Sequence, residues 1–346
     1  MAAQADPARP SGFADADALE DFMTAPSPAL CADLARAPGA IVILGVGGKM
    51  GPTLARLAKR ADPARGVIGV ARFSEPGLRE RLTAQGIECV AADLLDDANI
   101  DALPDAPNVV FMAGRKFGSS GDMPLTWAMN VLVPARVARR YAGSRIVAFS
   151  TGCVYPFVAV DGPGASEDVP VDPPGEYAWS CVGRERAFEH FSRRLRTPGR
   201  LFRLNYAIDM RYGVLHDIAR KVLADEPVDV AMGRCNVIWQ GEANSAALRL
   251  LAHCTTPTSP LNVSGATFLR VKDVAQAFGE RFGRAVRTTG TEGPTAWLTD
   301  TRRAQALLGA PAIDVATMID WTADWLERGG ASLGKPTHFE ARDGRY

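Results

Sequence analysis

The sequence predicts an α/β fold in which a doubly wound parallel sheet is followed by a smaller C-terminal region. Short apolar runs rich in β-branched residues recur through the first 150 residues, and helical patterns separate them. Continuous apolar strands that alternate with helices are typical of a parallel sheet covered on both faces. The runs are IVIL (41–44), VIGV (67–70), IECVA (87–91), NVVFMA (108–113) and RIVAFS (145–150).

Before the first strand, residues 1–38 predict an N-terminal extension that is partly mobile. Its first 15 residues are rich in Ala, Pro and Asp, and two short helical patterns follow, around Leu19–Met23 and Ala29–Ala37. The segment has no apolar stretch of the kind found in secretory signals.

Helical patterns of suitable length lie between and after the strands. Those of the first part are Met50–Arg60, Leu125–Tyr141 and Ala178–Leu195. Beyond about residue 200 the order is less regular, with strand-like LFRLN and CNVIWQ and helical Val214–Leu223, Asn244–Ala252, Val271–Phe282 and Ala312–Glu327. We therefore expect a sheet domain over 39–200 and a smaller, mainly α, substrate-binding region over 201–346.

Composition excludes several classes of protein. Lys plus Arg and Asp plus Glu both total 39, so the net charge is zero. The chain therefore lacks the excess positive charge that would indicate a nucleic acid or a membrane surface as partner. The six cysteines form no CxxC pair and the four histidines no HExxH motif, so we expect reduced thiols and no metal. The balanced charge leads us to expect a small-molecule substrate. No run of about 18 apolar residues occurs, so we expect no membrane-spanning helix and a cytoplasmic protein.

A glycine-rich turn follows the first strand and opens a helix. It reads Gly45-Val-Gly47-Gly48-Lys49-Met50-Gly51. Glycines let the backbone turn tightly and approach a pyrophosphate, and the N–H groups at the start of the helix bind the phosphate charge. A turn in this setting predicts a Rossmann-type dinucleotide site.

Two later strand ends bear on which dinucleotide binds. An acidic residue after the second strand would bind the adenosine ribose, but Ala71 stands there and Arg72 follows. Because arginine suits a 2′-phosphate, NADP is favoured over NAD. Asp93, after the third strand, is placed either to meet the adenine or to cap a helix.

Further motifs follow in a fixed order. They are FMAGRKFGSS (111–120), WAMNVLVPA with Asn130, FSTGCVYP (149–156), EYAWSCVGRE (176–185) and FRLNYA (202–207). With these motifs, residues 40–330 resemble the extended short-chain dehydrogenase/reductases, namely the NAD(P)-dependent epimerase/dehydratase family and especially UDP-glucose 4-epimerase and its relatives.

The resemblance implies roles for individual residues. It makes Thr151 the catalytic hydroxyl and Tyr177 the acid/base, both of which contact the reacting oxygen, and it places Cys153 and Asn205 at the substrate. It also implies a homodimer formed through the helices at 125–141 and 178–195. Its cofactor-binding residues beyond the glycine turn are Leu94, Ala113, Gly114, Lys116 and Asn130.

One expected residue is missing. The family motif has a lysine four residues after the tyrosine, where its charge lowers the pKa of the phenol, but Cys181 occupies that position. Losing a shift of about three pKa units would cost roughly a thousandfold in base activation. Lys116, Arg184, Arg186 or the oxidised nicotinamide could substitute, and Cys181 with Cys153 could instead form a redox pair.

Two departures from the family bear on the substrate. Gly152-Cys153 replaces the Asp-Glu pair that eliminates water in nucleotide-sugar 4,6-dehydratases, so we do not expect that reaction. In epimerases an arginine binds the nucleotide diphosphate, and Arg234 lies one residue away from the corresponding position. A simpler sugar or sugar acid is therefore as compatible with the sequence as a nucleotide sugar. The sequence thus favours hydride transfer at a sugar hydroxyl or carbonyl; the alternative is a non-catalytic, dinucleotide-binding relative with a regulatory or partner-subunit role.

Overall fold

The computed structural model describes residues 9–116 and 121–344 of the chain. Seven strands form one sheet in the order β12-β7-β5-β4-β1-β2-β3, and every neighbouring pair is parallel. The order reverses between β1 and β4, so the predicted doubly wound Rossmann-type sheet is confirmed. Its strands are β1 (Ile41–Leu44), β2 (Val67–Ala71), β3 (Glu88–Ala91), β4 (Asn108–Phe111), β5 (Arg145–Thr151), β7 (Gly199–Leu204) and β12 (Ser259–Val263).

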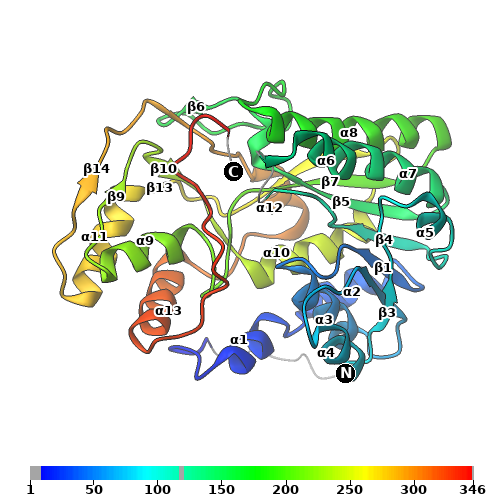
Figure 1. Cartoon of the computed structure of the whole chain (residues 1–346), viewed down its shortest axis with the longest axis horizontal. Helices are drawn as coiled ribbons and strands as arrows, with labels where there is room; N and C mark the ends of the chain where they lie inside the picture. The colour runs from blue at the N-terminus through cyan, green and yellow to red at the C-terminus, as the bar shows by residue number, and fades with distance from the viewer. Residues whose placement is uncertain (1–8, 117–120, 345–346) are drawn as a thin grey trace.

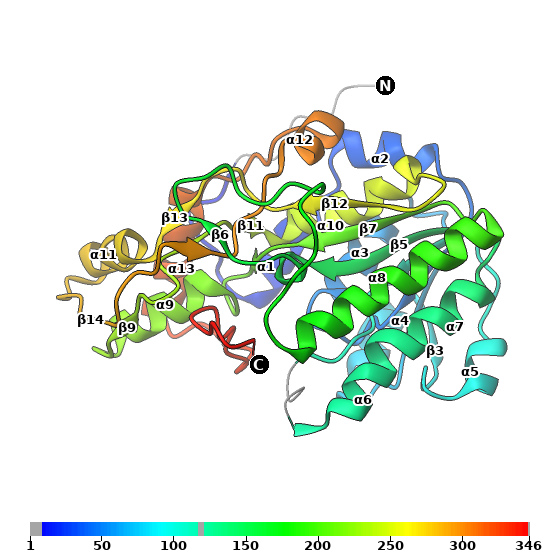
Figure 2. The same cartoon turned by 90° about the horizontal axis from the view of Figure 1, so that it is seen from above.

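Helices cover both faces of this sheet (Figures 1 and 2). On one face Leu54 and Leu57 pack in a core with Ile43, and on the other Val133 and Val137 pack with Val42. The first face carries α2 (Pro28–Ala35), α3 (Gly51–Ala61), α4 (Leu78–Ala84) and α10 (Gln240–Arg249), which continues into η4 (Leu250–His253). The second carries α5 (Asp97–Asp101), α6 (Met123–Trp127), the π-helical turn η2 (Ala128–Leu132), α7 (Val133–Arg140) and α8 (Glu176–Leu195).

A second lobe, mainly helical, lies beside the sheet (Figure 1). Aromatic rings form part of its core, where Phe13 lies 5.0 Å and Trp239 lies 5.4 Å from the ring of Trp321. Its helices are α1 (Ala16–Met23), α9 (Val214–Leu223), α11 (Val271–Phe282) and α13 (Val315–Glu327). Short strand pairs are β8 (Ala207–Ile208) with β11 (Ile238–Trp239), β9 (Val228–Asp229) with β14 (Thr288–Thr289), and β10 (Arg234–Cys235) with β13 (Leu269–Arg270).

The chain returns from the second lobe to the sheet. Helix α10 packs on α2 and α3, and β12 pairs with β7 at the edge of the sheet. A boundary at residues 200 and 201 falls inside β7, and the division into 39–200 and 201–346 remains a prediction. Helix α12 (Arg302–Leu308) packs against β12.

The C-terminal segment runs from the second lobe to the start of α8. The Leu333 N–H donates to the Arg211 carbonyl at 3.0 Å, and the Thr337 N–H donates to Asp217 Oδ2 at 2.7 Å. Arg342 then donates to the Thr295 carbonyl at 2.7 Å, on β15 (Thr295–Ala296), which pairs with β6 (Val158–Ala159). In the described part of the chain, no helix combines the length and apolar character needed to span a membrane.

Candidate active site

The predicted site residues gather at the carboxyl edge of the parallel sheet. Because all seven strands run in one direction, the residues that follow them meet at one edge, where doubly wound folds bind their ligands. In chain order these residues are Gly45 after β1, Arg72 after β2, Asp93 after β3, Ala113 after β4, Thr151 at the end of β5 and Asn205 after β7.

The glycine turn has the geometry that a bound pyrophosphate requires. Gly45 has φ +91°, and a Cβ there would lie 2.6 Å from the backbone nitrogen of Ala113. A Cβ on Gly51 would collide with the Val46 carbonyl, whereas Gly47 and Gly48 are exposed. No side chain caps α3, and the Gly51 N–H donates to the Gly48 carbonyl at 3.2 Å, which closes the turn. With two exposed glycines before the start of the helix, the turn fits the close approach of a dinucleotide.

Lys49 and Lys116 bring positive charge to the site. The Lys49 ammonium lies 3.2 Å from the centre of the Tyr212 ring, and burial lowers the pKa of Lys49 to about 7. Burial also lowers the pKa of Lys116, whose charge interacts with Cys153 and Cys181. Residues 117–120 of the predicted FMAGRKFGSS motif lie outside the described residues.

Arg72 and Asp93 lie at the end of the site nearest β2 and β3. Arg72 is exposed. Asp93 accepts a hydrogen bond from the Leu95 N–H at 3.0 Å, which closes a local turn, while the cap of α5 is Asp96. Asp93 therefore does not cap this helix; adjacent Leu94 is buried.

Asn130 connects the loop after β4 to helix α8. It lies fully buried in the π-helical turn, a feature that recurs at functional sites. Its amide exchanges hydrogen bonds with the Arg115 backbone, at 2.9 and 3.1 Å, and donates to Ser180 Oγ at 2.8 Å. Arg184 donates to the Asn130 Oδ1 at 2.7 Å, and Ser180 donates to the Tyr177 carbonyl at 2.6 Å.

The Thr151 turn packs against the start of α8. The hydroxyl oxygen of Thr151 accepts from the Cys153 N–H at 3.1 Å, which caps the 3₁₀ turn η3 (Gly152–Val154). Asn205 packs against this turn so closely that a Cβ on Gly152 would lie 3.1 Å from the Cγ of Asn205. The Asn205 amide donates to Asn236 Oδ1 at 2.9 Å, so it also joins two loops.

Tyr177 is buried in the first turn of α8, and its phenol meets the Cys181 thiol. Burial raises the pKa of Tyr177 well above its ordinary value, the nearby Cys181 and Cys153 raise it further, and Arg184 lowers it. Burial likewise raises the pKa of Cys181, which favours the neutral thiol over the thiolate. A protonated phenol at neutral pH suits proton donation to a substrate oxygen.

A buried polar network beneath the site did not emerge from the sequence. Ser150 donates to Glu185 Oε1 at 2.6 Å, and Arg203 pairs with Glu185 Oε2 at 2.6 Å. Arg203 also donates to the Tyr155 hydroxyl, which donates to Asn262 Oδ1 at 2.8 Å. The glutamate of the EYAWSCVGRE motif was the available signal, but it lies on α8 and its partner arginine lies on β7.

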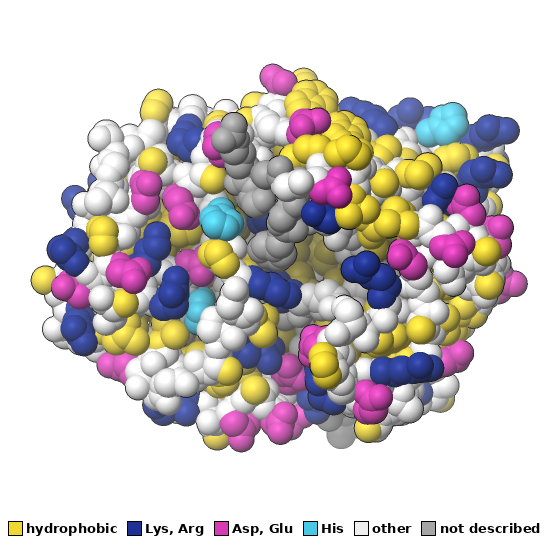
Figure 3. All heavy atoms as spheres, viewed as in Figure 1, with side chains coloured by type: hydrophobic (Ala, Val, Ile, Leu, Met, Phe, Trp, Pro, Cys, Tyr) yellow, Lys and Arg dark blue, Asp and Glu magenta, His cyan; other side chains and the backbone are white. Residues whose placement is uncertain are grey.

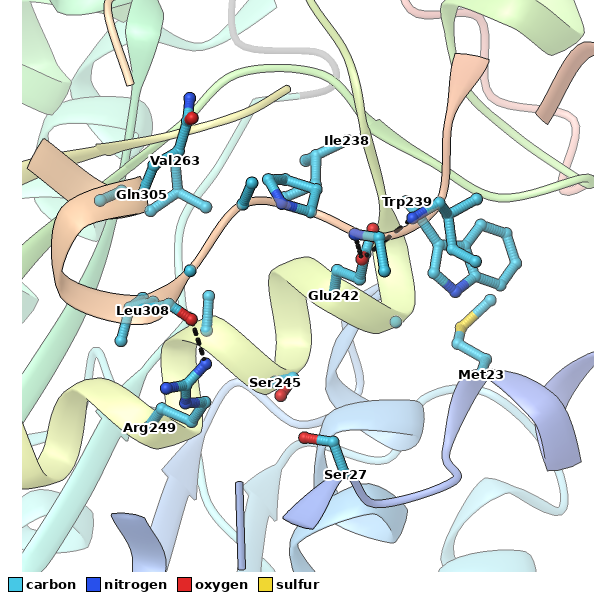
Figure 4. A pocket seen from close by; sticks show the side chains of 18 of the residues that line it. Met23, Ser27, Ile238, Trp239, Glu242, Ser245, Arg249, Val263, Gln305 and Leu308 are labelled. Atoms are coloured by element: carbon cyan, nitrogen blue, oxygen red, sulfur yellow. Dashed lines mark hydrogen bonds between the residues drawn. The ribbon is translucent and has the colours of Figure 1, made fainter. Parts of the chain in front are cut away.

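A separate cavity of about 470 Å³ lies between α10, α12 and the N-terminal helices (Figure 4). Glu242 Oε1 accepts the Ile313 N–H at 3.2 Å, and Arg249 donates to the Leu308 carbonyl at 2.6 Å, so both side chains tether the loop that follows α12. None of the residues predicted for catalysis or cofactor binding lines this cavity.

Comparison with known families and structures supplements this geometry. The model of the NAD dependent epimerase/dehydratase family matches residues 41–208, from β1 through β8. Over these residues, which make up just under half of the chain, the sequence is similar to the NAD-dependent epimerase/dehydratase family. This match includes the glycine turn, Asn130, Thr151 and Tyr177 of the predicted site. No curated protein matches the sequence significantly.

Solved structures show that this chain shares its fold with proteins of known structure. MoeE5 in complex with UDP-glucose and NAD is 21% identical, with a TM-score of 0.68 over 84% of this chain and 99% of that one. UDP-glucose 4-epimerase from Thermotoga maritima with UDP-glucose is 15% identical, with a TM-score of 0.70 over 84% and 99%. The dTDP-glucose 4,6-dehydratase DesIV from Streptomyces venezuelae, with NAD and TYD bound, is 17% identical, with a TM-score of 0.72 over 84% and 97%.

Proposed function

We propose that the chain is an NAD(P)-dependent oxidoreductase or epimerase that acts on a hydroxyl or carbonyl of a sugar or sugar-acid-like substrate. The observation that carries this proposal is the convergence of the glycine turn, the Thr151 turn and the start of α8 at one edge of the sheet. The match of residues 41–208 to the epimerase/dehydratase family model supports it, as does the NAD bound in the structures of MoeE5 and DesIV.

The cofactor would lie along the carboxyl edge of the sheet. The backbone of the glycine turn and the Lys49 ammonium would hold the pyrophosphate, and Lys116 would contribute a second charge. Exposed Arg72 favours NADP, because its guanidinium would reach a 2′-phosphate, although NAD remains an alternative. When bound, the nicotinamide would supply the site that takes up or returns hydride.

The protein's own groups would handle the proton. Thr151 would hydrogen-bond the substrate oxygen, and Tyr177 would donate its proton to that oxygen during carbonyl reduction or remove it during alcohol oxidation. Cys153 and Asn205, which flank Thr151, would contact the substrate. Without an Asp-Glu pair at Gly152-Cys153, water elimination of the 4,6-dehydratase kind is not proposed.

The substrate would be a sugar or a sugar-acid-like molecule. MoeE5 and the Thermotoga epimerase were solved with UDP-glucose, which makes nucleotide sugars the first probes. In this chain Arg234 lies opposite Arg270 in a short strand pair of the second lobe, where Glu292 pairs with Arg270 at 2.6 Å. A sugar or sugar acid that lacks the nucleotide is therefore a parallel candidate.

A catalytically impaired relative is the second candidate function. Cys181 in place of the family's lysine favours it, since the phenol then lacks its usual cation. Such a protein would bind the dinucleotide and act as a regulatory or partner subunit. It would show no hydride transfer with any sugar probe.

We further propose a cytoplasmic homodimer, with no nucleic-acid or membrane partner. Large hydrophobic side chains are exposed on α6, η2 and α8, namely Trp127 at 36%, Leu132 at 45% and Trp179 at 41%. Hydrophobic side chains gather over this part of the molecule (Figure 3). Their exposure supports a second copy packing against these helices.

Replacing Tyr177 with Phe tests the proposed chemistry. We expect turnover of UDP-glucose or glucuronic acid with NAD⁺ or NADP⁺ to fall at least about a hundredfold because the proton donor is gone. Net oxidation is measured as reduced nicotinamide, and epimerisation, which leaves the cofactor oxidised, is measured as formation of the epimeric sugar. Dinucleotide affinity should not change. Tyr141→Phe is the matched control, since its hydroxyl bonds to the Pro104 carbonyl away from the site. Full activity in Tyr177→Phe would refute the assignment.

A further inference from the structure

Helix α8 carries a buried arginine near the place of the missing lysine. Tyr177, Cys181 and Arg184 are spaced i, i+4 and i+7, so they share one face of the helix. Cys181 is fully buried and Arg184 is only 7% exposed. A short side chain at the lysine position is therefore followed, one turn later, by a long cationic one.

Three elements hold the guanidinium of Arg184 at the cofactor edge. Its Nη2 donates to Asn130 Oδ1 at 2.7 Å, its Nη1 donates to the Phe149 carbonyl at 2.9 Å, and its Cζ lies 5.8 Å from the Phe111 ring centre. A Cβ on Gly114 would collide with Nη2. The head group thus lies against the loop that follows β4.

Arg184 has no carboxylate partner among the described residues. Its Nε–H is buried without an acceptor, and both of its bonded partners are neutral amide oxygens. Neighbouring Glu185 is neutralised by Arg203. Buried charges are normally paired. We therefore expect an anion to form next to the Arg184 guanidinium during the reaction.

We propose that Arg184 is a positioning residue that replaces the missing lysine, with its guanidinium stabilising the phenolate form of Tyr177 across the short side chain of Cys181. This inference rests on the proposed function for its role in turnover. Among the described residues, the titratable groups that act on the phenol are Cys181 and Arg184 on α8 and Cys153 on η3, and of these three Arg184 is the cation. Lys116 faces the two thiols and is the rival source of charge.

Titration of Tyr177 tests the proposal without a substrate. Tyrosinate absorbance is followed with rising pH in NAD⁺-saturated protein, and the same titration of the matching Tyr177→Phe variant is subtracted. We expect Arg184→Met to raise the pKa of Tyr177 by about 1–3 units. Adding Cys181→Lys to that variant should lower it again, which a purely structural role of Arg184 would not explain.

Arg186→Met is the matched control, because that side chain is 58% exposed and pairs with Glu189. An unchanged titration in Arg184→Met, a shift in Lys116→Met alone, or a wild-type Tyr177 that never ionises would each overturn the proposal. Should Arg184→Met not fold, two other variants provide the same comparison. One is the single variant Arg184→Lys, and the other combines Cys181→Lys with Arg184→Ala. If the protein shows no turnover but the pKa of Tyr177 still depends on Arg184, the proposed function is refuted and the proposed role of Arg184 is not.

Discussion

Lys49 places a titratable ammonium group beside the glycine turn. Burial lowers its pKa to about 7, and a bound pyrophosphate would raise that pKa again. The charge therefore contributes fully to dinucleotide affinity below pH 7, and its contribution is lost as pH rises through the higher pKa of the complex. We expect the affinity for NADPH, measured by fluorescence titration, to fall up to about tenfold per pH unit above 7.

Lys49→Met should weaken binding at low pH and abolish this pH dependence. Lys59→Met is the control, because Lys59 bonds to the Arg65 carbonyl at the other end of α3. A steep pH dependence that survives in Lys49→Met would show that another group carries the charge.

At the scale of residues, the sequence located the glycine turn because a local motif determines it. It could not choose among Lys116, Arg184 and Arg186 as the cation near Tyr177. The structure separates the two arginines, since Arg184 is buried and reaches Asn130, whereas Arg186 is exposed and pairs with Glu189 on the same helix. That difference depends on which helix face packs inward and on a partner 54 residues away.

At the scale of elements, the Glu185–Arg203 pair ties α8 to β7 beneath the site. Both side chains are buried, with Arg203 also bonded to the Tyr155 hydroxyl. We expect Arg203→Met to lower the free energy of unfolding by about 3–5 kcal/mol, measured by urea denaturation, because it leaves a buried carboxylate unpaired. Adding Glu185→Gln should recover part of this loss. A loss below about 1 kcal/mol would contradict a buried, paired role.

The elements that the sequence predicted are those with strong periodicity. Helices Val214–Leu223 and Val271–Phe282 have the predicted bounds. Strand β12 was missed because Pro260 interrupts it, and proline is tolerated there since β12 is the edge strand of the sheet. Edge position is a property of the assembled sheet and has no local signal.

At the scale of the whole molecule, the exposed tryptophans on α6 and α8 bear on assembly. We expect the wild-type protein to sediment as a dimer and Trp179→Glu to sediment as a monomer, because a charge there would be buried at the proposed interface. Leu333→Glu is the control, since Leu333 is 37% exposed on the C-terminal segment away from these helices. A monomeric wild-type protein would contradict the proposed homodimer.

The most direct test of the central claim is to denature freshly purified protein and identify any released nucleotide by mass spectrometry, with NADPH and NADH titrations if none is found. We expect a nicotinamide dinucleotide, either released in stoichiometric amount, as in an epimerase, or bound exchangeably, as in a dehydrogenase or reductase. Failure to release or bind either dinucleotide would contradict the assignment of the glycine turn and, with it, both candidate functions.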